Sequence, residues 1–563
     1  MKNEKQRDTQ SREKGFMSGV LCLSASTLIV KIIGLAFKIP MLSYLGTEGM
    51  GYFNSAYEIY ALLCVISTAG LPVALSMLVS AARTRGDGAE IKRIYRVASG
   101  LFAFLGLGGS LLMLLLCRVL ADAIGNPDAY LCIAAIAPAL FFICMASAAR
   151  GYCQGFEDMM PTAVSQLIEA VCKLALGVLF AVWGIKKGLS VSMIAALSVL
   201  GVTVGTLASA LYLAFQRSKR KFAVAQTGKK ASQKQKSILR ELVAIALPIT
   251  LGSALLGLTR IIDMTLIMRR LRSIGFSTLE ANNVYGAYTT LAVPVFSLVP
   301  ALITPVSMAL VPQLSSFIEE KDVRGQRTAT ENAMRLTVIF SLPASLGLAA
   351  FSTPILELLF RGQSEAIAIA APLLAVLGLS VVFSCLITTT NAVLQAQRRA
   401  GLPIISMLLG VIVKLVTSYL LIGNRNIGAL GAPIGSLACN ISVTALNLCF
   451  MSAHGGCSFD GVKTFFKPMP ASLVSVGGAL AIYAFLLDRF ETVYMPFAVS
   501  VSFALLVYLI FSVLTKSITR DDVELLPFGE HIFRLFKKIK HKGRNKNNDR
   551  GNNDGSTKEK NAS

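Results

Sequence analysis

Long apolar segments separated by short polar connections make up most of this chain. Each is near or above the roughly 20 residues that an α-helix needs to cross the hydrocarbon core of a bilayer. A membrane β-barrel would instead show alternating segments of about ten residues, and none occur in this sequence. The pattern predicts an all-α polytopic membrane protein with 14 transmembrane helices. They are expected at residues 17–45, 50–82, 94–117, 129–150, 160–183, 190–215, 242–268, 284–312, 334–360, 367–395, 402–423, 429–452, 466–487 and 495–515.

The composition supports this class. Hydrophobic residues make up 54% of the chain, charged residues 15%, and the mean hydropathy is +0.63. A soluble enzyme does not have such values. The first apolar segment is too long for a cleaved secretory signal and lacks a small-residue cleavage site, so we interpret it as a retained first span.

The basic residues follow the connections in alternation. Of 54 lysines and arginines, 40 lie in the N-terminus, the tail and every second loop, nine lie in the opposite loops, and five lie within spans. The positive-inside rule then predicts a plasma-membrane protein with both termini in the cytoplasm. The net charge of +23 is thus explained by topology and attraction to anionic lipids, and no nucleic-acid-binding motif accompanies it.

A strongly basic segment, residues 216–241, separates two sets of six spans. Across it Tyr52 matches Tyr285 at an offset of 233, and Lys173 matches Lys414 at an offset of 241. We interpret this as an internal duplication into two six-helix lobes, although chance similarity between apolar sequences would give the same few identities. The expected domains are a basic N-terminus, a first lobe, a linker, a second lobe, two additional helices, and an amphipathic segment with a disordered tail: residues 1–16, 17–215, 216–241, 242–452, 466–515 and 516–563.

Two lysines lie inside the first apolar segment. Lys31 and Lys38 are seven residues apart, which places them only about 20° apart around a helix. Ser24, Thr27 and Gly34 share that stripe. Because a lysine at the bilayer centre costs roughly 2.5 to 3.5 kcal/mol, we expect the stripe to line a watery cavity.

Other ionisable residues within the spans have nearby partners. Glu169 and Lys173 are four residues apart, and Arg260 and Asp263 are three apart, so each pair is spaced for an ion pair along its own helix. Lys414 has no such partner. Glu58, one turn from Asn54, is a candidate to reach Lys31 or Lys38 across helices. If Glu58 forms a purely structural ion pair with one of these lysines, the other lysine remains free.

Five basic residues against three acidic ones predict a net positive cavity and, without a nucleotide-binding P-loop, a transporter for an anion. The candidate substrate-binding residues are Lys31, Lys38, Glu58, Arg260, Asp263, Lys173 and Lys414, with Ser24, Thr27, Gly34 and Asn54 lining the cavity. With only three histidines and no metal-ligand spacing among eleven cysteines, we expect no metal and no cofactor, apart from the membrane potential or a coupling ion.

Two short motifs predict local helix geometry. Ala69, Gly70, Leu71 and Pro72 interrupt the second span, which is typical either of a packing kink or of a broken helix beside a cavity. Gly151 and Gly155 form a G-x-x-x-G pair that permits close helix approach.

Five segments, in this order and spacing, resemble the multidrug/oligosaccharidyl-lipid/polysaccharide exporter superfamily, and most of all its stage V sporulation protein B branch. They are the Lys31–Pro40 segment leading to YLGTEGMGYF, TAGLPVALSMLVS, RGYCQGFEDMMPTAVSQ, ALPITLGS and ALVPQLSS. The resemblance implies two lobes arranged in a V that open alternately to the two sides of the membrane. Fourteen spans also resemble the MurJ type of lipid II flippase, in which cavity arginines hold a lipid pyrophosphate; this sequence has lysines instead.

The resemblance and the charges together predict a flippase, not an enzyme, that moves an undecaprenyl-pyrophosphate-linked sugar to the outer leaflet for cell-wall or spore-wall synthesis. The expected partners are that lipid, anionic membrane lipids and cell-wall synthesis proteins. Three alternatives remain open from the sequence. They are a drug or cation antiporter using Glu58 and Asp263, a membrane-embedded glycosyltransferase, which the short outer loops disfavour, and a non-transporting scaffold.

Overall fold

The computed structural model describes residues 2–156, 158–219, 235–397, 399, 401–453, 468–490 and 494–514, and the side chains of the first helix from Ser26 on. These residues form helices and short turns, with no β-strand among them. The main helices are α1 (Lys2–Thr68), α2 (Leu71–Thr84), α3 (Gly88–Leu115), α4 (Cys117–Ile124), α5 (Tyr130–Gly155), α6 (Met160–Lys186), α7 (Val191–Lys219), α8 (Gln235–Ser273), α9 (Thr278–Ala287), α10 (Val293–Glu319), α11 (Val323–Ala350), α12 (Ser352–Leu359), α13 (Ser364–Ala396), α14 (Gly401–Ile422), α15 (Gly431–Ala453), α16 (Pro468–Leu487) and α17 (Tyr494–Leu514).

The number of spans agrees with the sequence prediction. The described part of the chain contains 13 apolar helical segments long enough to cross a membrane, and the first of them, Ile29–Thr84, has 56 residues. That is more than twice the length one crossing needs. Gly46 divides this segment with φ 63° and ψ −174°, a conformation that favours glycine. The divided segment supplies two crossings, so the all-α fold with 14 spans is confirmed.

The predicted interruption of the second span is also confirmed. α1 ends at Thr68 and α2 begins at Leu71, with a bend between them. Gly70 lies so close to α8 that an added Cβ would collide with the backbone carbonyl of Ala246. The bend is therefore fixed by contact with the second half of the chain.

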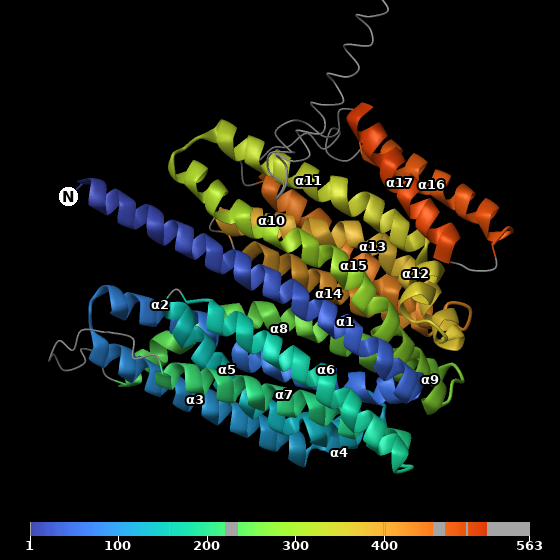
Figure 1. Cartoon of the computed structure of the whole chain (residues 1–563), viewed down its shortest axis with the longest axis horizontal. Helices are drawn as coiled ribbons and strands as arrows, with labels where there is room; N and C mark the ends of the chain where they lie inside the picture. Colours follow the sequence, from blue (N-terminus) through green and yellow to red (C-terminus); the bar gives the residue numbers. More distant parts are fainter. Residues whose placement is uncertain are drawn as a thin grey trace, which may run out of the picture.

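The helices form two groups that are joined at the end where α9 begins (Figure 1). One group contains α2–α7 and the other contains α10–α15. α1 runs diagonally between the groups and packs against α5, α6, α8 and α9. This arrangement makes α1 the element that both lobes share.

Glycines permit the closest approach within the first group. Gly151 of α5 faces the backbone of Pro72, and Gly155 faces Val79, so an added Cβ at either position would meet α2. The predicted G-x-x-x-G contact is therefore present, between α5 and α2.

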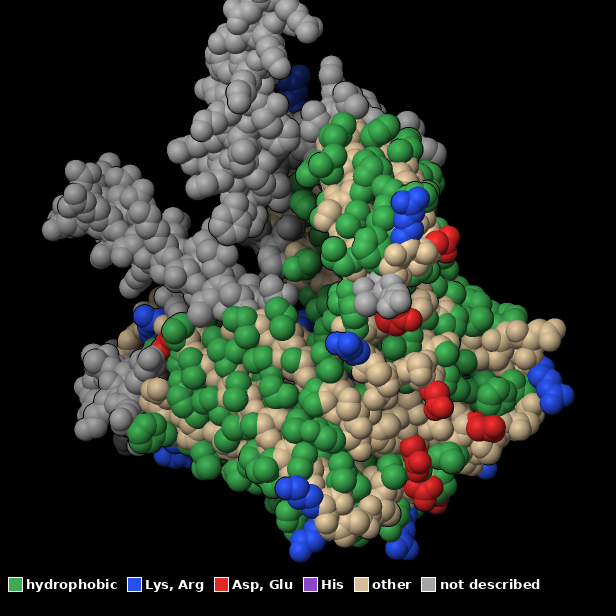
Figure 2. Space-filling model, turned by 45° about the vertical axis from the view of Figure 1, so that its right-hand side comes forward, with side chains coloured by type: hydrophobic (Ala, Val, Ile, Leu, Met, Phe, Trp, Pro, Cys, Tyr) green, Lys and Arg blue, Asp and Glu red, His purple; other side chains and the backbone are tan. Residues whose placement is uncertain are grey.

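α16 and α17 pack against each other and lie on the outside of the second group, where α16 contacts α11 (Figure 1). Figure 2 shows a surface over the helices that is largely hydrophobic, with lysine and arginine side chains towards its edges. Such a surface suits lipid contact. Residues 220–234 of the predicted linker and the predicted amphipathic segment and tail, 516–563, lie outside the described residues.

Candidate functional site

Lys38 on α1 contacts the opposite lobe directly. Its Nζ donates a hydrogen bond to the backbone carbonyl of Thr289 at 2.5 Å. Thr289 lies in a single π-helical turn, Tyr288–Ala292, between α9 and α10. Because a π-turn breaks the regular i to i−4 pattern, it is a place where a carbonyl is available to a side-chain donor.

Lys31 lies two turns before Lys38 on α1. Its side chain is exposed and makes no hydrogen bond or ion pair with any residue that the structure describes. The two lysines of the predicted stripe therefore differ, because only Lys38 has a polar contact in this conformation.

Lys173 of α6 is surrounded by aromatic rings of α1. Its ammonium group lies 5.1 Å from the ring centre of Phe37, 5.8 Å from that of Phe53 and 4.4 Å from that of Tyr57. Such contacts stabilise a cation by about 0.5 to 2 kcal/mol without neutralising it. The predicted ion pair with Glu169 is wrong, since the structure gives Lys173 aromatic neighbours in its place.

Glu169 instead pairs with Arg150 of α5. The Arg150 guanidinium donates to the Glu169 carboxylate at 3.0 Å and also to the hydroxyls of Ser165 and Ser209. The sequence reasoning missed Arg150 because it placed this residue at the end of a span. Arg150 lies five residues before the end of α5, and this position inside the helix could have identified it as a charge within the membrane.

Glu58 and Arg260 form an ion pair between α1 and α8, with 3.5 Å between Oε2 and Nη1. The Arg260 side chain is 48% exposed although it lies in the middle of a long apolar helix. Since an arginine facing lipid is costly, the exposed part is best explained by a watery space between the lobes. Glu58 therefore binds neither lysine of the stripe directly, although it lies within electrostatic range of Lys38.

Asp263 and Lys414 form the most buried ion pair. Lys414 Nζ donates to Asp263 Oδ2 at 2.7 Å, joining α8 to α14, and the two side chains are 11% and 7% exposed, Asp263 first. The predicted pairing of Asp263 with Arg260 along α8 is therefore wrong. Lys414, expected to lack a local partner, finds one on a helix 151 residues away.

The remaining predicted cavity residues divide by depth. Thr27 is exposed, Gly34 is half-buried and has open space where a Cβ would be, and the side chain of Ser24 lies outside the described part. Asn54 is buried and donates to the hydroxyls of Thr289 and Thr290, each at 2.9 Å. Asn54 therefore contacts the same π-turn as Lys38.

The ion pairs leave an excess of positive charge on the first lobe. With Arg150 included, the cluster has six basic and three acidic residues, and each acid is paired with one base. The remaining three bases, Lys31, Lys38 and Lys173, have no ion-pair partner among the described residues. They lie on α1 and α6, beside the interface between the lobes.

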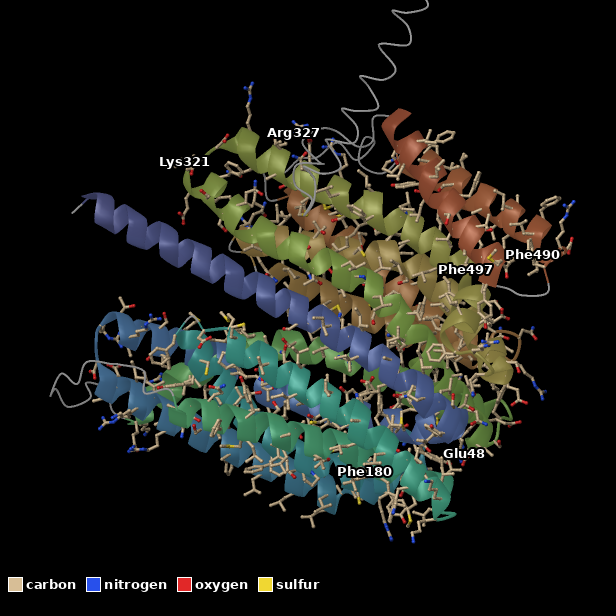
Figure 3. The ribbon with its side chains drawn as sticks, viewed as in Figure 1. Glu48, Phe180, Lys321, Arg327, Phe490 and Phe497 are labelled. Carbon is tan, nitrogen blue, oxygen red and sulfur yellow. The ribbon has the colours of Figure 1, made fainter. Side chains whose placement is uncertain are left out.

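A polar seam closes this interface at the α9 end; we use the term for Thr47, Glu48, Asn126, Asn282 and Asn283. Thr47 donates to Asn283 at 3.1 Å, Asn282 donates to the Glu48 carbonyl at 2.9 Å, and Asn126 donates to Asn282 at 2.8 Å. Glu48, two residues after the Gly46 bend of α1, is labelled in Figure 3. The lobes are thus held together at this end by hydrogen bonds between neutral groups and the backbone.

Residues 16–318 match the polysaccharide biosynthesis protein family, and residues 282–420 match the MatE family. Stage V sporulation protein B of Bacillus subtilis (strain 168) is 28% identical over 445 residues, which are 78% of this chain and 83% of that protein.

Two further similarities concern flippases of lipid II. The Lipid II flippase MurJ of Bacillus subtilis (strain 168) is 23% identical over 459 residues, covering 79% of this chain and 84% of that protein. The solved structure of a Lipid II flippase MurJ in an inward closed conformation superposes with a TM-score of 0.69 and 16% identity, over 88% of this chain and 99% of that one. The structural match establishes that the two chains share a fold.

Proposed function

The chain belongs to the polysaccharide biosynthesis protein family, and we propose that it is a flippase that moves a prenyl-pyrophosphate-linked sugar from the inner to the outer leaflet of the cell membrane. Its relatives include a flippase of lipid II and a sporulation protein, which supports a lipid-linked precursor as the general substrate class. The prenyl chain would remain in the lipid while the charged headgroup passes between the lobes.

The observation that carries this proposal is the set of Lys31, Lys38 and Lys173 without carboxylate partners among the described residues. A pyrophosphate diester carries two negative charges and many acceptor oxygens. Hydrogen bonds from ammonium groups to such oxygens are about twice as strong as neutral ones. The positive charges of the three lysines therefore compensate for the hydration that the headgroup loses on leaving water.

Lys38 gives the binding step a route to the lobe movement. In this conformation it donates to the Thr289 carbonyl on the other lobe. A phosphate oxygen is a stronger acceptor than a carbonyl, so a bound headgroup would compete for Lys38 and weaken the contact between lobes. Binding energy would then favour the alternating opening that transport requires.

The membrane potential supplies a driving force. A potential that is negative inside favours outward movement of an anion by roughly 2.3 kcal/mol per charge per 100 mV. A doubly charged headgroup therefore gains about 4.6 kcal/mol at 100 mV. No nucleotide hydrolysis is needed for a vectorial step of this size.

A flipping assay in reconstituted vesicles tests the proposal. We expect Lys31→Ala combined with Lys38→Ala to lose at least about 90% of flipping of a fluorescent undecaprenyl-pyrophosphate sugar, because two charge-assisted contacts of roughly 1.5 to 3 kcal/mol each are removed. Lys321→Ala combined with Arg324→Ala removes two exposed bases, one in the turn between α10 and α11 and one in the first turn of α11, and serves as the matched control. Undiminished flipping by the first pair at equal protein content would refute the assignment.

The same variants separate the alternatives. A cation antiporter needs an acidic group available to its substrate, whereas Glu58 is paired with Arg260 and Asp263 with Lys414. Drug efflux that depends on Glu58 and ignores both lysines would favour an antiporter. Absence of flipping by the unmodified protein, with normal assembly of its membrane complex, would favour a scaffold.

A further inference from the structure

A second basic site lies away from the contact between the lobes. A pocket of about 540 Å³ opens between α3, α5 and α7, lined by Lys92, Tyr95, Arg96, Ser99, Met145, Tyr152 and Arg217. α3 and α7 lie on the side of the first lobe that faces away from the second lobe (Figure 1). The pocket is therefore separate from the candidate transport site.

The pocket has three basic side chains and no acidic one. Lys92 and Arg96 stand one turn apart at the beginning of α3, and Arg217 stands near the end of α7. All three are exposed at the pocket mouth. Three converging cations without a carboxylate in the lining form a site for an anion with several oxygens.

The aromatic residues of the pocket orient one of these cations. The Arg217 guanidinium lies 4.3 Å from the ring centre of Tyr95, and Tyr95 packs edge-on against Tyr152 at 4.9 Å. Stacking holds a guanidinium plane while leaving its edge free to donate hydrogen bonds. Arg217 is thus preorganised to bind an anion.

An unsatisfied hydroxyl points to the same kind of ligand. Ser99 lines the pocket, and its Oγ, which neighbouring atoms cover in this conformation, has no hydrogen-bond partner among the described residues. Buried polar groups without a partner are uncommon, because each costs about 1 to 3 kcal/mol. A rotation of the Ser99 side chain about χ1 would turn this hydroxyl towards the pocket, where a ligand oxygen would be its missing partner.

The location favours a lipid as the source of that oxygen. The pocket lies where α3 begins and α7 ends, which is the end of the helices that the positive-inside rule assigns to the cytoplasm. Exposed apolar side chains of α3, such as Phe104 and Leu107, continue from it along the helix. A headgroup in the pocket would therefore leave its acyl chains beside an apolar helix surface.

We infer that this pocket binds the phosphate group of an anionic phospholipid of the inner leaflet. The cations bind the phosphate oxygens, Ser99 donates its hydroxyl to one of them, and Met145 with the aromatic rings contacts the glycerol region. Bound lipid then anchors the outer helices of the first lobe at the membrane surface.

Native mass spectrometry of the purified full-length protein with phosphatidylglycerol and phosphatidylcholine tests this inference. We expect phosphatidylglycerol to bind preferentially, and Arg96→Gln combined with Arg217→Gln to weaken its binding about thirtyfold, from the loss of two surface cations. Arg217→Lys keeps the charge but loses the planar stacking, so its loss should be only a few-fold. Lys321→Gln combined with Arg324→Gln, two exposed bases of the second lobe, should bind like the unmodified protein (Figure 3 labels Lys321).

Three results would overturn the inference. The first is equal binding of the two phospholipids, and the second is an equal loss in the pocket pair and the control pair. The third is displacement of the lipid by glycerol phosphate at equal concentration, which would assign the site to a soluble phosphate. Thermal unfolding of each variant in detergent verifies that all are folded.

Discussion

At the residue scale, Lys173 and Lys414 occupy equivalent positions in the two repeats but have different surroundings. Each is the fourteenth residue of its helix, α6 or α14, as the duplication predicts. Lys414 is buried against Asp263, whereas Lys173 lies over three aromatic rings. Buried ion pairs hold helices in place, while a cation over rings keeps its charge available to a ligand. We therefore expect Lys414 to have a structural role and, under the proposed function, Lys173 to contribute to substrate binding.

Asp263→Asn tests the structural role of the buried pair. The substitution leaves the Lys414 charge buried without a counter-charge, and we expect a loss of about 3 to 5 kcal/mol in the free energy of unfolding. Replacing both residues, Asp263→Val with Lys414→Met, should recover most of that loss, since apolar replacement of a buried pair is often neutral. Denaturant unfolding in detergent measures both, and the double variant should still flip lipid.

A stable Asp263→Asn protein without flipping activity would contradict this assignment. That result would place Asp263 and Lys414 among the substrate-binding residues.

At the element scale, the break between α1 and α2 depends on Gly70. The sequence predicts the break from Gly70 and Pro72, and the structure shows why glycine is needed, because Gly70 touches the α8 backbone. The Gly70 amide also donates to the Thr250 hydroxyl on α8 at 3.2 Å. The break therefore serves as the contact between the second span and the second half of the chain.

Gly70→Ala should push α2 away from α8. Overpacking of this kind costs about 1 to 3 kcal/mol, so we expect a lower unfolding temperature and reduced flipping. Gly100→Ala, in the interior of α3 where a Cβ meets nothing within 4 Å, is the control and should stabilise the protein by up to about 1 kcal/mol. Equal unfolding temperatures for the two variants would show that the close contact between Gly70 and α8 does not affect the stability of the protein.

At the scale of the whole molecule, the polar seam joins the lobes at the end where α9 lies. Its members belong to α1 and α9 together with Asn126, and its bonds are those of neutral side chains. Each such bond contributes only about 0.5 to 1.5 kcal/mol. A seam of this strength is suited to opening and closing during transport.

Covalent closure of the seam should stop flipping. We expect Thr47→Cys with Asn283→Cys, joined by a short thiol-reactive cross-linker in a background without other cysteines, to abolish activity, and a reducible cross-linker to permit recovery on reduction. Asp128→Cys with Ser192→Cys joins two parts of one lobe, where Ser192 donates to the Asp128 carbonyl, and should leave activity unchanged. Full activity in the cross-linked seam variant would show that the lobes need not separate there.

Much of the architecture was predictable because a bilayer imposes strong rules on sequence. Apolar segments long enough to span the hydrocarbon core located all fourteen spans, and glycine with proline located the break near Gly70. The ion pairs were not predictable in the same way. Spacing along one helix suggested Glu169 with Lys173 and Arg260 with Asp263, whereas the structure pairs each acid with a base from another helix.

The sequence by itself determined the class of protein, the helices and the presence of costly charges within them, because each follows from local composition and the solvent. Only the tertiary structure decided which charges neutralise one another. In two of the ion pairs the partners are more than 150 positions apart in the sequence, so spacing along one helix does not predict them. In the structure Asp263 forms an ion pair with Lys414, and Glu58 forms one with Arg260. Lys31, Lys38 and Lys173 thereby remain without a carboxylate partner among the described residues, and in the proposed function they are the cations that bind the anionic headgroup.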